Sequence, residues 1–171
     1  QKYHLPNNFF LSVSRLYDYK HVDWAIESCV KTNKNLVIVG NGPDSKYLKE
    51  ISKNHRNIIF LGFLDDDKDV QVLYKQALAL LFCGIEDFGL VPVEAMAQGT
   101  SIIAYNKGGV TETVLEEKTG EFFNNQEELT YILNHFDKSM YNPTTIKNRA
   151  KDFTEKKFLQ NLENYLSQIY E

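Results

Sequence analysis

One continuous segment of the chain reads Ala79-Leu-Leu-Phe82, Cys83-Gly-Ile-Glu86-Asp-Phe-Gly89, Leu90-Val-Pro92-Val-Glu94-Ala-Met-Ala-Gln98. Its first four residues are apolar, as in a buried strand, and its middle part combines glycines with carboxylates, as in a loop. Pro92 suits the first turn of a helix, because its missing amide hydrogen would have no partner there anyway. The segment therefore predicts a strand, a loop and a helix in succession.

The same alternation of short apolar runs and amphipathic stretches recurs along the chain, which is typical of βαβ units. Because the short runs are apolar on both sides, we expect a parallel sheet that helices cover on both faces. The predicted strands are Phe9–Val13, Leu36–Val39, Ile58–Leu61, Ala79–Phe82, Ser101–Ala104 and Gly120–Phe123. The predicted helices are His21–Thr32, Ser45–Asn54, Lys68–Gln76, Val91–Gln98, Val110–Leu115, Gln126–His135, Pro143–Asp152 and Thr154–Tyr170.

We thus predict one α/β domain over residues 1–171, with a Rossmann-like doubly wound parallel sheet in residues 1–124 and a helical C-terminal tail in residues 125–171. In the last helix, Phe158, Leu162 and Ile169 lie on one side. This helix needs a surface to lie on.

Length and composition exclude several classes of protein. The 171 residues suit one hydrophobic core, and the net charge of -4 gives no field for gripping a nucleic-acid backbone. Cys29 and Cys83 are expected to be buried, reduced thiols. No apolar run approaches the roughly 20 residues that a membrane helix needs, and Gln1–Phe10 lacks a signal-peptide pattern. We therefore expect a cytoplasmic protein.

The loops that follow the predicted strands are unusual in composition. In a parallel sheet, ligands bind outside the carboxyl ends of the strands, where helix N-termini and loop amides point into one crevice. Gly40 and Gly42 follow the second strand and are candidate ligand contacts. Further candidate loops hold Ser14-Arg15-Leu16, Gly62, Glu86-Asp-Phe-Gly89 and Lys107-Gly-Gly109.

The loop after the fourth strand predicts an anion site. With Pro92 in the first turn, the amides around Gly89 and Leu90 point outward at the positive end of the helix dipole. Glu86 and Glu94 lie on either side of this turn, and a carboxylate can accept two hydrogen bonds from a vicinal diol. A sugar or ribose beside a phosphate would satisfy both kinds of group. The alternative is that Glu94 merely complements the helix dipole.

Arg15 and Lys20, after the first strand, can supply positive charge to the same crevice. At about 4 Å and an effective dielectric near 20, each pair with a phosphate gives roughly 4 kcal/mol before desolvation, which suffices to hold a diphosphate without a metal. The alternative is a pair of solvated surface cations. Their loop therefore belongs with the predicted anion site.

Several other functions lose their main support. Gly40-Asn-Gly42-Pro43 lacks the third glycine of a dinucleotide fingerprint, and the chain has no P-loop. The four histidines have no ligand spacing with one another or with the cysteines, so no metal site is predicted. The chain also lacks a Gly-x-Ser-x-Gly nucleophile elbow.

Taken together, these motifs resemble the C-terminal, donor-binding domain of retaining GT-B glycosyltransferases of family 4, and among these the bacterial mannosyltransferases of O-antigen and capsule assembly. The resemblance covers nearly the whole chain. It is carried by Ser14-Arg15-Leu16 with Lys20, Gly40-x-Gly42-Pro43, Phe60-Leu-Gly62, Glu86-Asp-Phe-Gly-Leu-Val-Pro-Val-Glu94-Ala and Gly108-Gly109-x-x-Glu112. This chain differs from many members of the family at one position: the residue after Lys20 is His21, where they have glycine.

The resemblance implies a role for each matched residue. Arg15 and Lys20 would bind the nucleotide diphosphate, Glu94 the ribose hydroxyls, and Glu86 the donor sugar near its reacting carbon. The backbone amides of Phe88, Gly89 and Leu90 would contact the sugar and the phosphate.

The resemblance also implies the reaction and the partners. The reaction would transfer a hexose, namely mannose, to a glycan or lipid-linked acceptor with retention of the anomeric configuration. The donor would be a nucleotide diphosphate sugar, either GDP-mannose or a UDP-sugar. A complete enzyme of this kind has an N-terminal acceptor domain, for which the 171 residues leave no room, so this chain alone is expected to be inactive. The enzyme would be cytoplasmic, with a peripheral position at the inner membrane face.

Two other functions remain open at this point. A nucleotide-sugar epimerase of the same two-domain build would release an epimerised free sugar instead of a transferred one. A non-catalytic nucleotide-binding domain would keep its function after Glu86→Ala.

Overall fold

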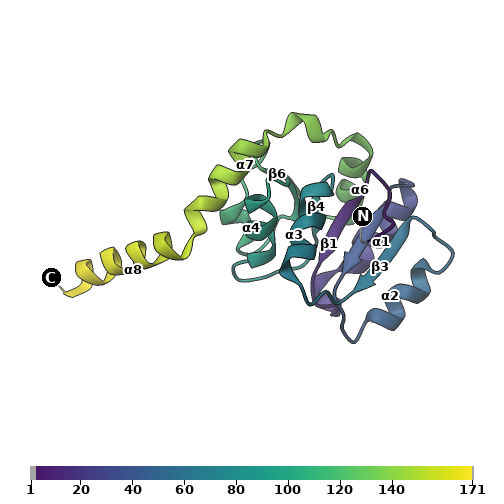
Figure 1. Cartoon of the computed structure of the whole chain (residues 1–171), viewed down its shortest axis with the longest axis horizontal. Coiled ribbons are helices and arrows are strands. Elements are labelled where there is room, and N and C mark those ends of the chain that lie inside the picture. Colours follow the sequence, from purple (N-terminus) through teal and green to yellow (C-terminus); the bar gives the residue numbers. More distant parts are fainter. Residues whose placement is uncertain (1–2, 171) are drawn as a thin grey trace.

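The computed structural model describes residues 3–170 and contains one six-stranded, fully parallel sheet in the order β3-β2-β1-β4-β5-β6 (Figure 1). This is the strand order of doubly wound dinucleotide-binding folds, in which the chain reverses its direction of winding between β1 and β4. The strands are β1 (Phe10–Val13), β2 (Leu36–Val39), β3 (Ile58–Gly62), β4 (Leu80–Phe82), β5 (Ile102–Tyr105) and β6 (Gly120–Phe123). The predicted Rossmann-like fold is confirmed.

Helices cover both faces of the sheet, and successive strand residues face opposite layers. In β1, Phe10 packs into one core cluster and Leu11 into the other, as the two-residue period of a strand requires. The first layer holds α1 (Val22–Lys31), α2 (Ser45–Ser52) and α6 (Gln126–His135). The second holds α3 (Asp67–Gln76), α4 (Leu90–Ala97), α5 (Val110–Thr113) and α7 (Pro143–Ala150).

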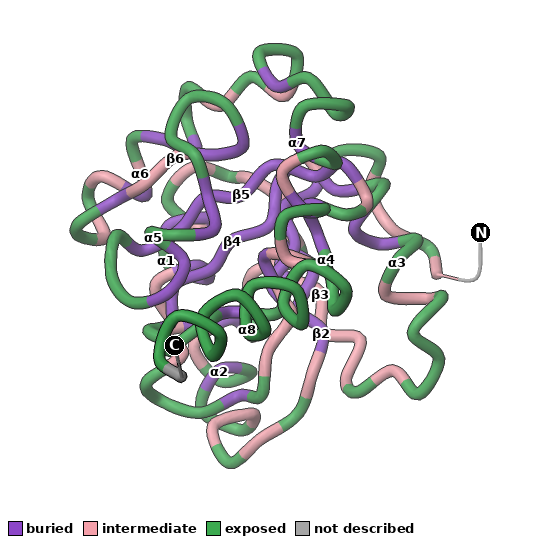
Figure 2. Tube along the Cα trace, turned by 90° about the vertical axis from the view of Figure 1, so that its left-hand side faces the viewer, coloured by how far each residue is buried: buried purple, intermediate pink, exposed green. Residues whose placement is uncertain are grey.

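The helical end of the chain is divided between these layers and one separate helix. α6 and α7 belong to the two layers, whereas α8 (Glu155–Tyr170) extends away from the rest (Figure 1). The residues of α8 are exposed along its described length, with Phe158 64% and Ile169 55% exposed (Figure 2). The apolar side of the last helix, which the sequence predicts, is therefore present but uncovered within residues 3–170.

Helix ends differ from the prediction by a few residues. α2 ends at Ser52, two residues before the predicted Asn54, and α5 ends at Thr113. The end of the predicted Pro143–Asp152 helix tightens into a 3-10 helix, η3 (Lys151–Phe153). Two further 3-10 helices, η1 (Asp18–Lys20) and η2 (Lys138–Met140), were not predicted. Among the described helices, none combines the length and apolarity needed to cross a bilayer.

The loops after β1 and β2 pack backbone against backbone, which explains two glycines. A Cβ at Gly40 would lie 1.9 Å from the carbonyl oxygen of Ser14, and one at Gly42 would lie 2.2 Å from that of Leu16. Gly40 also has a φ of 127°, in a region that other residues rarely adopt. These glycines therefore allow the two loops to meet.

We expect Gly40→Ala to lower the free energy of unfolding by about 2–4 kcal/mol, because the methyl group meets backbone atoms and the φ is unfavourable. Gly62→Ala is the matched control. Its φ is 72°, but an added Cβ would meet only the Asn41 side chain at 3.7 Å, so a loss of about 1 kcal/mol is expected. Urea denaturation measures both, and equal losses would contradict the close-approach explanation.

Candidate functional site

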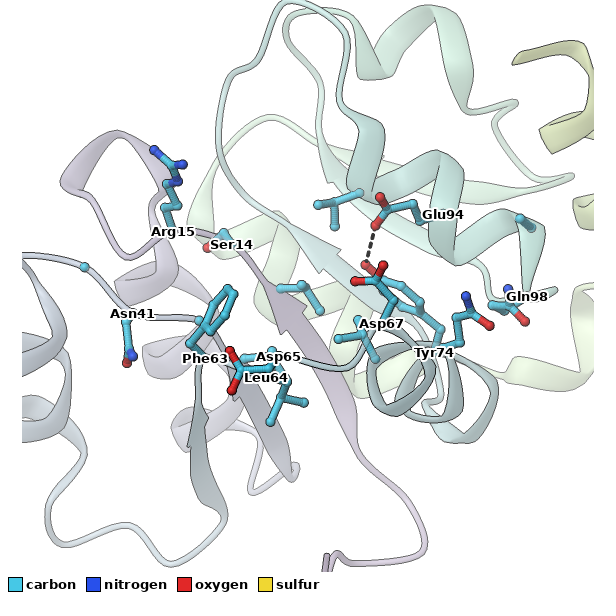
Figure 3. A pocket seen from close by; sticks show the side chains of 18 of the residues that line it. Ser14, Arg15, Asn41, Phe63, Leu64, Asp65, Asp67, Tyr74, Glu94 and Gln98 are labelled. Atoms are coloured by element: carbon cyan, nitrogen blue, oxygen red, sulfur yellow. Dashed lines mark hydrogen bonds between the residues drawn. The ribbon is translucent and has the colours of Figure 1, made fainter. Parts of the chain in front are cut away.

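A pocket of about 850 Å³ opens at the carboxyl end of the sheet, beside the point where the winding reverses. Its walls come from the loops after β1, β2 and β3 and from the sides of α3 and α4. Figure 3 shows Arg15 and Ser14 from the first loop on one side and Glu94 on α4 on the other. This position is where open α/β sheets bind their ligands.

Arg15, Gly40, Gly42 and Glu94 all line this pocket, as predicted for residues of a single site. Arg15 is exposed on its rim. The Oγ atom of Ser14 next to it is buried and has no hydrogen-bond partner within residues 3–170. Such an orphaned hydroxyl in a pocket wall can still donate to a ligand.

Lys20 and Glu86 form an ion pair between the loop after β1 and the loop after β4. Their side chains are 12% and 26% exposed. The chain at Lys20 packs closely on the other loop, since a Cβ at Gly84 would lie only 3.1 Å from the Lys20 Cα. Because an ammonium has three donors, Lys20 can keep Glu86 and still donate to an anion.

The N-terminus of α4 has the geometry predicted for an anion site. Gly89 is the N-cap, with a φ of 83° that only glycine adopts without strain, and no side chain caps the helix. Pro92 is buried in the first turn. The helix begins at Leu90, one residue before the predicted start, and Leu90 is 64% exposed. The first amides of α4 are therefore left for a ligand or water.

Glu94 projects from α4 into the pocket and accepts a hydrogen bond of 3.2 Å from the Tyr74 hydroxyl (Figure 3). Partial burial raises the pKa of the Glu94 carboxyl, and the negative charge of Asp67 raises it further, while the bond from Tyr74 acts in the opposite direction. Burial and the neighbouring carboxylate also raise the pKa of Tyr74, which therefore stays a donor.

The other predicted residues lie at the neighbouring loop. Glu86, Phe88, Gly89 and Leu90 lie at or just before the start of α4, and neither they nor Lys20 line the pocket; α4 connects them to it only through Glu94. His21, the residue that differs from many relatives, has a left-handed φ of 49°, which explains why glycine suits that position. The structure thus brings the predicted side chains to one edge of the sheet. Their contacts with a ligand stay a prediction.

One wall of the pocket was missed by the sequence analysis. Phe63, Asp65 and Asp67 come from the segment after β3, where only Gly62 was singled out. Phe63 is 66% exposed despite its apolar ring. An aromatic residue and a run of aspartates directly after a strand were the available signal. Among the described residues, no group of three or more His, Cys, Asp or Glu side chains could hold a metal ion.

Solved structures share this fold over nearly the whole chain. The lipopolysaccharide outer core galactosyltransferase WaaB, in its apo form, matches 98% of this chain and 51% of its own, with 22% identity and a TM-score of 0.84. Anabaena Alr3699/HepE in complex with UDP matches 95% of this chain and 49% of its own, with 24% identity and a TM-score of 0.79.

Among curated proteins, the alpha-1,3/1,6-mannosyltransferase ALG2 of Dictyostelium discoideum is 28% identical in an alignment 197 residues long. The alignment covers 94% of this chain and 46% of that protein. The chain spans less than half the length of several curated relatives it matches. The family model described as glycosyl transferases group 1 matches residues 2–157. The chain therefore belongs to the group 1 glycosyl transferases.

Proposed function

We propose that this chain is the donor-binding part of a retaining glycosyltransferase that transfers mannose from GDP-mannose to a hydroxyl of a glycan or lipid-linked acceptor. The observation that carries the proposal is the Lys20–Glu86 ion pair in the loop that leads into the uncapped N-terminus of α4, the helix that also presents Glu94 to the pocket. Cations, free amides and two carboxylates at one edge are what a sugar joined to a diphosphate requires.

The proposed chemistry is mainly electrostatic. As the bond between the sugar and the diphosphate breaks, negative charge grows on the leaving phosphate. Arg15, Lys20 and the first amides of α4 stabilise that charge more than they stabilise the ground state. Glu86 lies beside Lys20, where its carboxylate can face the positive charge that develops on the sugar ring. The diphosphate leaves without help from an acidic side chain, and its oxygen at the broken bond takes the proton that the acceptor hydroxyl loses as it bonds to the sugar carbon.

The acidic wall of the pocket supports guanine as the base. Asp67 is close enough to Glu94 to raise its pKa, so it belongs with the ribose end, while Asp65 lies beside the exposed ring of Phe63 (Figure 3). A carboxylate can accept both the N1–H and N2–H groups of guanine, whereas the edge of uracil places carbonyl oxygens on either side of its single N–H. Phe63 offers a face for stacking. Asp65 therefore favours GDP over UDP, while Phe63 can stack on either base.

The apolar side of α8 fits a second domain of the same enzyme. A mannosyltransferase relative is more than twice as long as its match to this chain. In the proposed enzyme, a domain that binds the acceptor covers Phe158, Leu162 and Ile169 and closes over the donor. The enzyme works in the cytoplasm, at the inner face of the membrane where a lipid-linked acceptor would lie.

Lys20→Ala should lower the affinity for GDP by about 10- to 100-fold, because it removes a charge-assisted bond to phosphate and leaves Glu86 unpaired. Arg15→Ala should lower the affinity for GDP by a similar factor. Lys53→Ala is the control, because Lys53 pairs only with Glu50 on the exposed surface of the described chain. Calorimetric titration measures all three, and unchanged affinity in the first two variants would refute the phosphate role.

The base preference can be tested with inosine diphosphate, which is GDP without the 2-amino group. The unaltered chain should bind GDP about 10-fold more tightly than inosine diphosphate or UDP, the loss expected for one hydrogen bond to a charged group. Asp65→Asn should remove most of that difference, while Asp69→Asn, on the following helix, should keep it. Tighter binding of UDP by the unaltered chain would overturn the assignment of guanine.

Nucleotide affinity should fall on acidification, because protonated Glu94 can no longer accept both ribose hydroxyls. The raised pKa of Glu94 places this loss at a higher pH than for an ordinary glutamate. Tyr74→Phe removes the hydrogen bond that lowers the pKa of Glu94, so the loss of GDP affinity should begin at a still higher pH. Titrations with GDP between about pH 5 and pH 8 measure the shift.

Glu94→Gln is the control for this series, because it leaves only the titration of the phosphate itself. If the three pH profiles coincide, Glu94 does not bind the ribose.

A further inference from the structure

Two contacts with neighbouring loops at the edge of the sheet hold the loop Glu86–Gly89, called here the donor loop. The Glu86 side chain pairs with Lys20. The backbone rests on the turn after β5, where Gly109 N donates to Glu86 O at 2.8 Å. A Cβ at Gly109 would lie 2.2 Å from the carbonyl oxygen of Asp87. These contacts fix the first half of the loop to the sheet.

A third contact comes from the other end of the chain. The ring of Phe88 meets that of Phe153 edge to face, with centroids 5.9 Å apart and an interplanar angle of 69°. Phe153 is the last residue of η3 and lies two residues before the start of α8 at Glu155. The donor loop therefore touches the segment from which the last helix departs.

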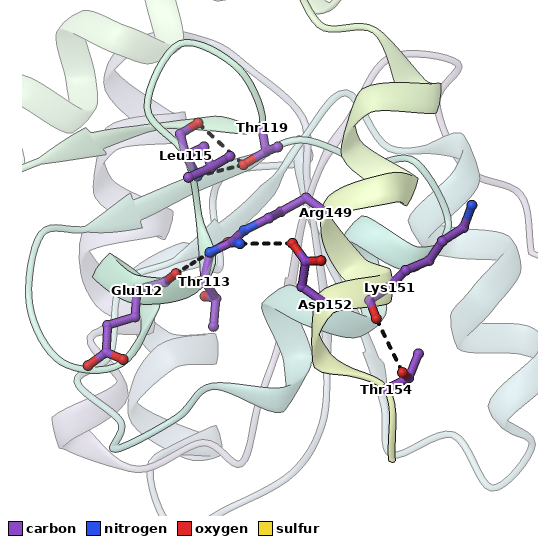
Figure 4. Close-up of polar contacts among 8 residues, drawn as sticks. All are labelled: Glu112, Thr113, Leu115, Thr119, Arg149, Lys151, Asp152 and Thr154. Atoms are coloured by element: carbon purple, nitrogen blue, oxygen red, sulfur yellow. Dashed lines mark hydrogen bonds and ion pairs between the residues drawn. The ribbon is translucent and has the colours of Figure 1, made fainter. Parts of the chain in front are cut away.

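Arg149 holds Phe153 in place. Its guanidinium carbon lies 4.7 Å from the centre of the Phe153 ring. The same guanidinium donates to the carbonyl of Thr113 at 2.9 Å and to that of Glu112, at the end of α5, and pairs with Asp152 at 2.9 Å (Figure 4). α5 follows the Gly108-Gly109 turn, which contacts the donor loop. The contacts of Arg149 therefore connect α7 and η3 to the donor loop through α5 as well as through Phe153.

The pair of phenylalanines contributes little to the hydrophobic core. Neither ring belongs to the two core clusters, and Phe88 remains 44% exposed. Their contact therefore restricts a loop that already has a backbone support. The amide nitrogens that follow Phe88 begin α4, so the orientation of Phe88 bears directly on the predicted phosphate contacts.

We propose that Phe153 is a positioning residue for donor binding. Through Phe88 it holds the N-terminus of α4 in the orientation that receives the diphosphate, and it couples that orientation to the direction in which α8 leaves the domain. This inference rests on the proposed function of the donor loop. A partner surface that turns α8 would thereby alter affinity for the donor without touching it.

The test compares GDP affinity, by calorimetric titration, with the free energy of unfolding, by urea denaturation. Phe153→Ala should weaken GDP binding by about 3- to 10-fold, the range expected for loss of one aromatic pair, while leaving the unfolding midpoint near that of the unaltered chain. Phe153→Trp should restore most of the affinity, because it keeps an aromatic edge. Tyr131→Ala, which removes an exposed ring from α6, is the control and should bind GDP normally.

A double-mutant cycle distinguishes positioning from general loosening. If Phe153 acts through Phe88, adding Phe153→Ala to Phe88→Ala should cause no further loss, so the double variant should lose no more affinity than the worse single variant. Additive losses, or a loss that follows the unfolding midpoint, would overturn the inference. So would normal binding by Phe153→Ala. If the unaltered chain binds neither GDP, UDP nor ADP, the proposed function fails, and this inference fails with it.

Discussion

The ion pair between Lys20 and Glu86 spans the place where the winding of the sheet reverses. β1 and β4 are neighbours in the sheet, but the chain continues from them in opposite directions, to β2 on one side and β5 on the other. Their loops therefore diverge and leave an opening that the sheet itself cannot close. The pair joins the two loops across that opening, and both the cations and the amides of the candidate site depend on their being held together.

The glycines of the site loops serve this arrangement in different ways. Gly40 and Gly42 let the backbones after β1 and β2 come into contact, and Gly108 and Gly109 do the same for the donor loop. Gly89 instead supplies a left-handed residue at the start of α4. Close loop packing therefore accounts for Gly40 and Gly42 even without a ligand, whereas at Gly89 the requirement concerns the helix end that a phosphate would approach.

The sequence predicted the fold well because periodicity and core burial are local signals. Each predicted strand, from β1 to β6, has its counterpart in the structure, and α6 has the predicted bounds. The ends of α2 and α5 were less predictable, since helix ends depend on capping and on tertiary contacts. η1 could not be recognised from its three residues alone. It matters nevertheless, because it carries Lys20 to Glu86.

The site was predictable where a motif marks it and not where only folding assembles it. Arg15 and Glu94 stood out by their place after a strand and at the start of a helix. The bond from Tyr74 to Glu94 joins residues from two helices whose side chains have no pattern in common. The same holds for Phe88 and Phe153, which are separated by four α-helices, two strands and the 3-10 helix η2.

The stability of α8 differs from that of the other helices, because its apolar side is exposed. Residues 155–169 of α8 have no covering surface within the described part of the chain, and a helix of this length is only marginally stable in water by itself. The enthalpy of its backbone bonds must be supplemented by burial of its apolar stripe. In the proposed two-domain enzyme, formation of a stable α8 and its coverage by the acceptor-binding domain are therefore one coupled equilibrium, and the helical content of this segment would measure how far the two domains have assembled.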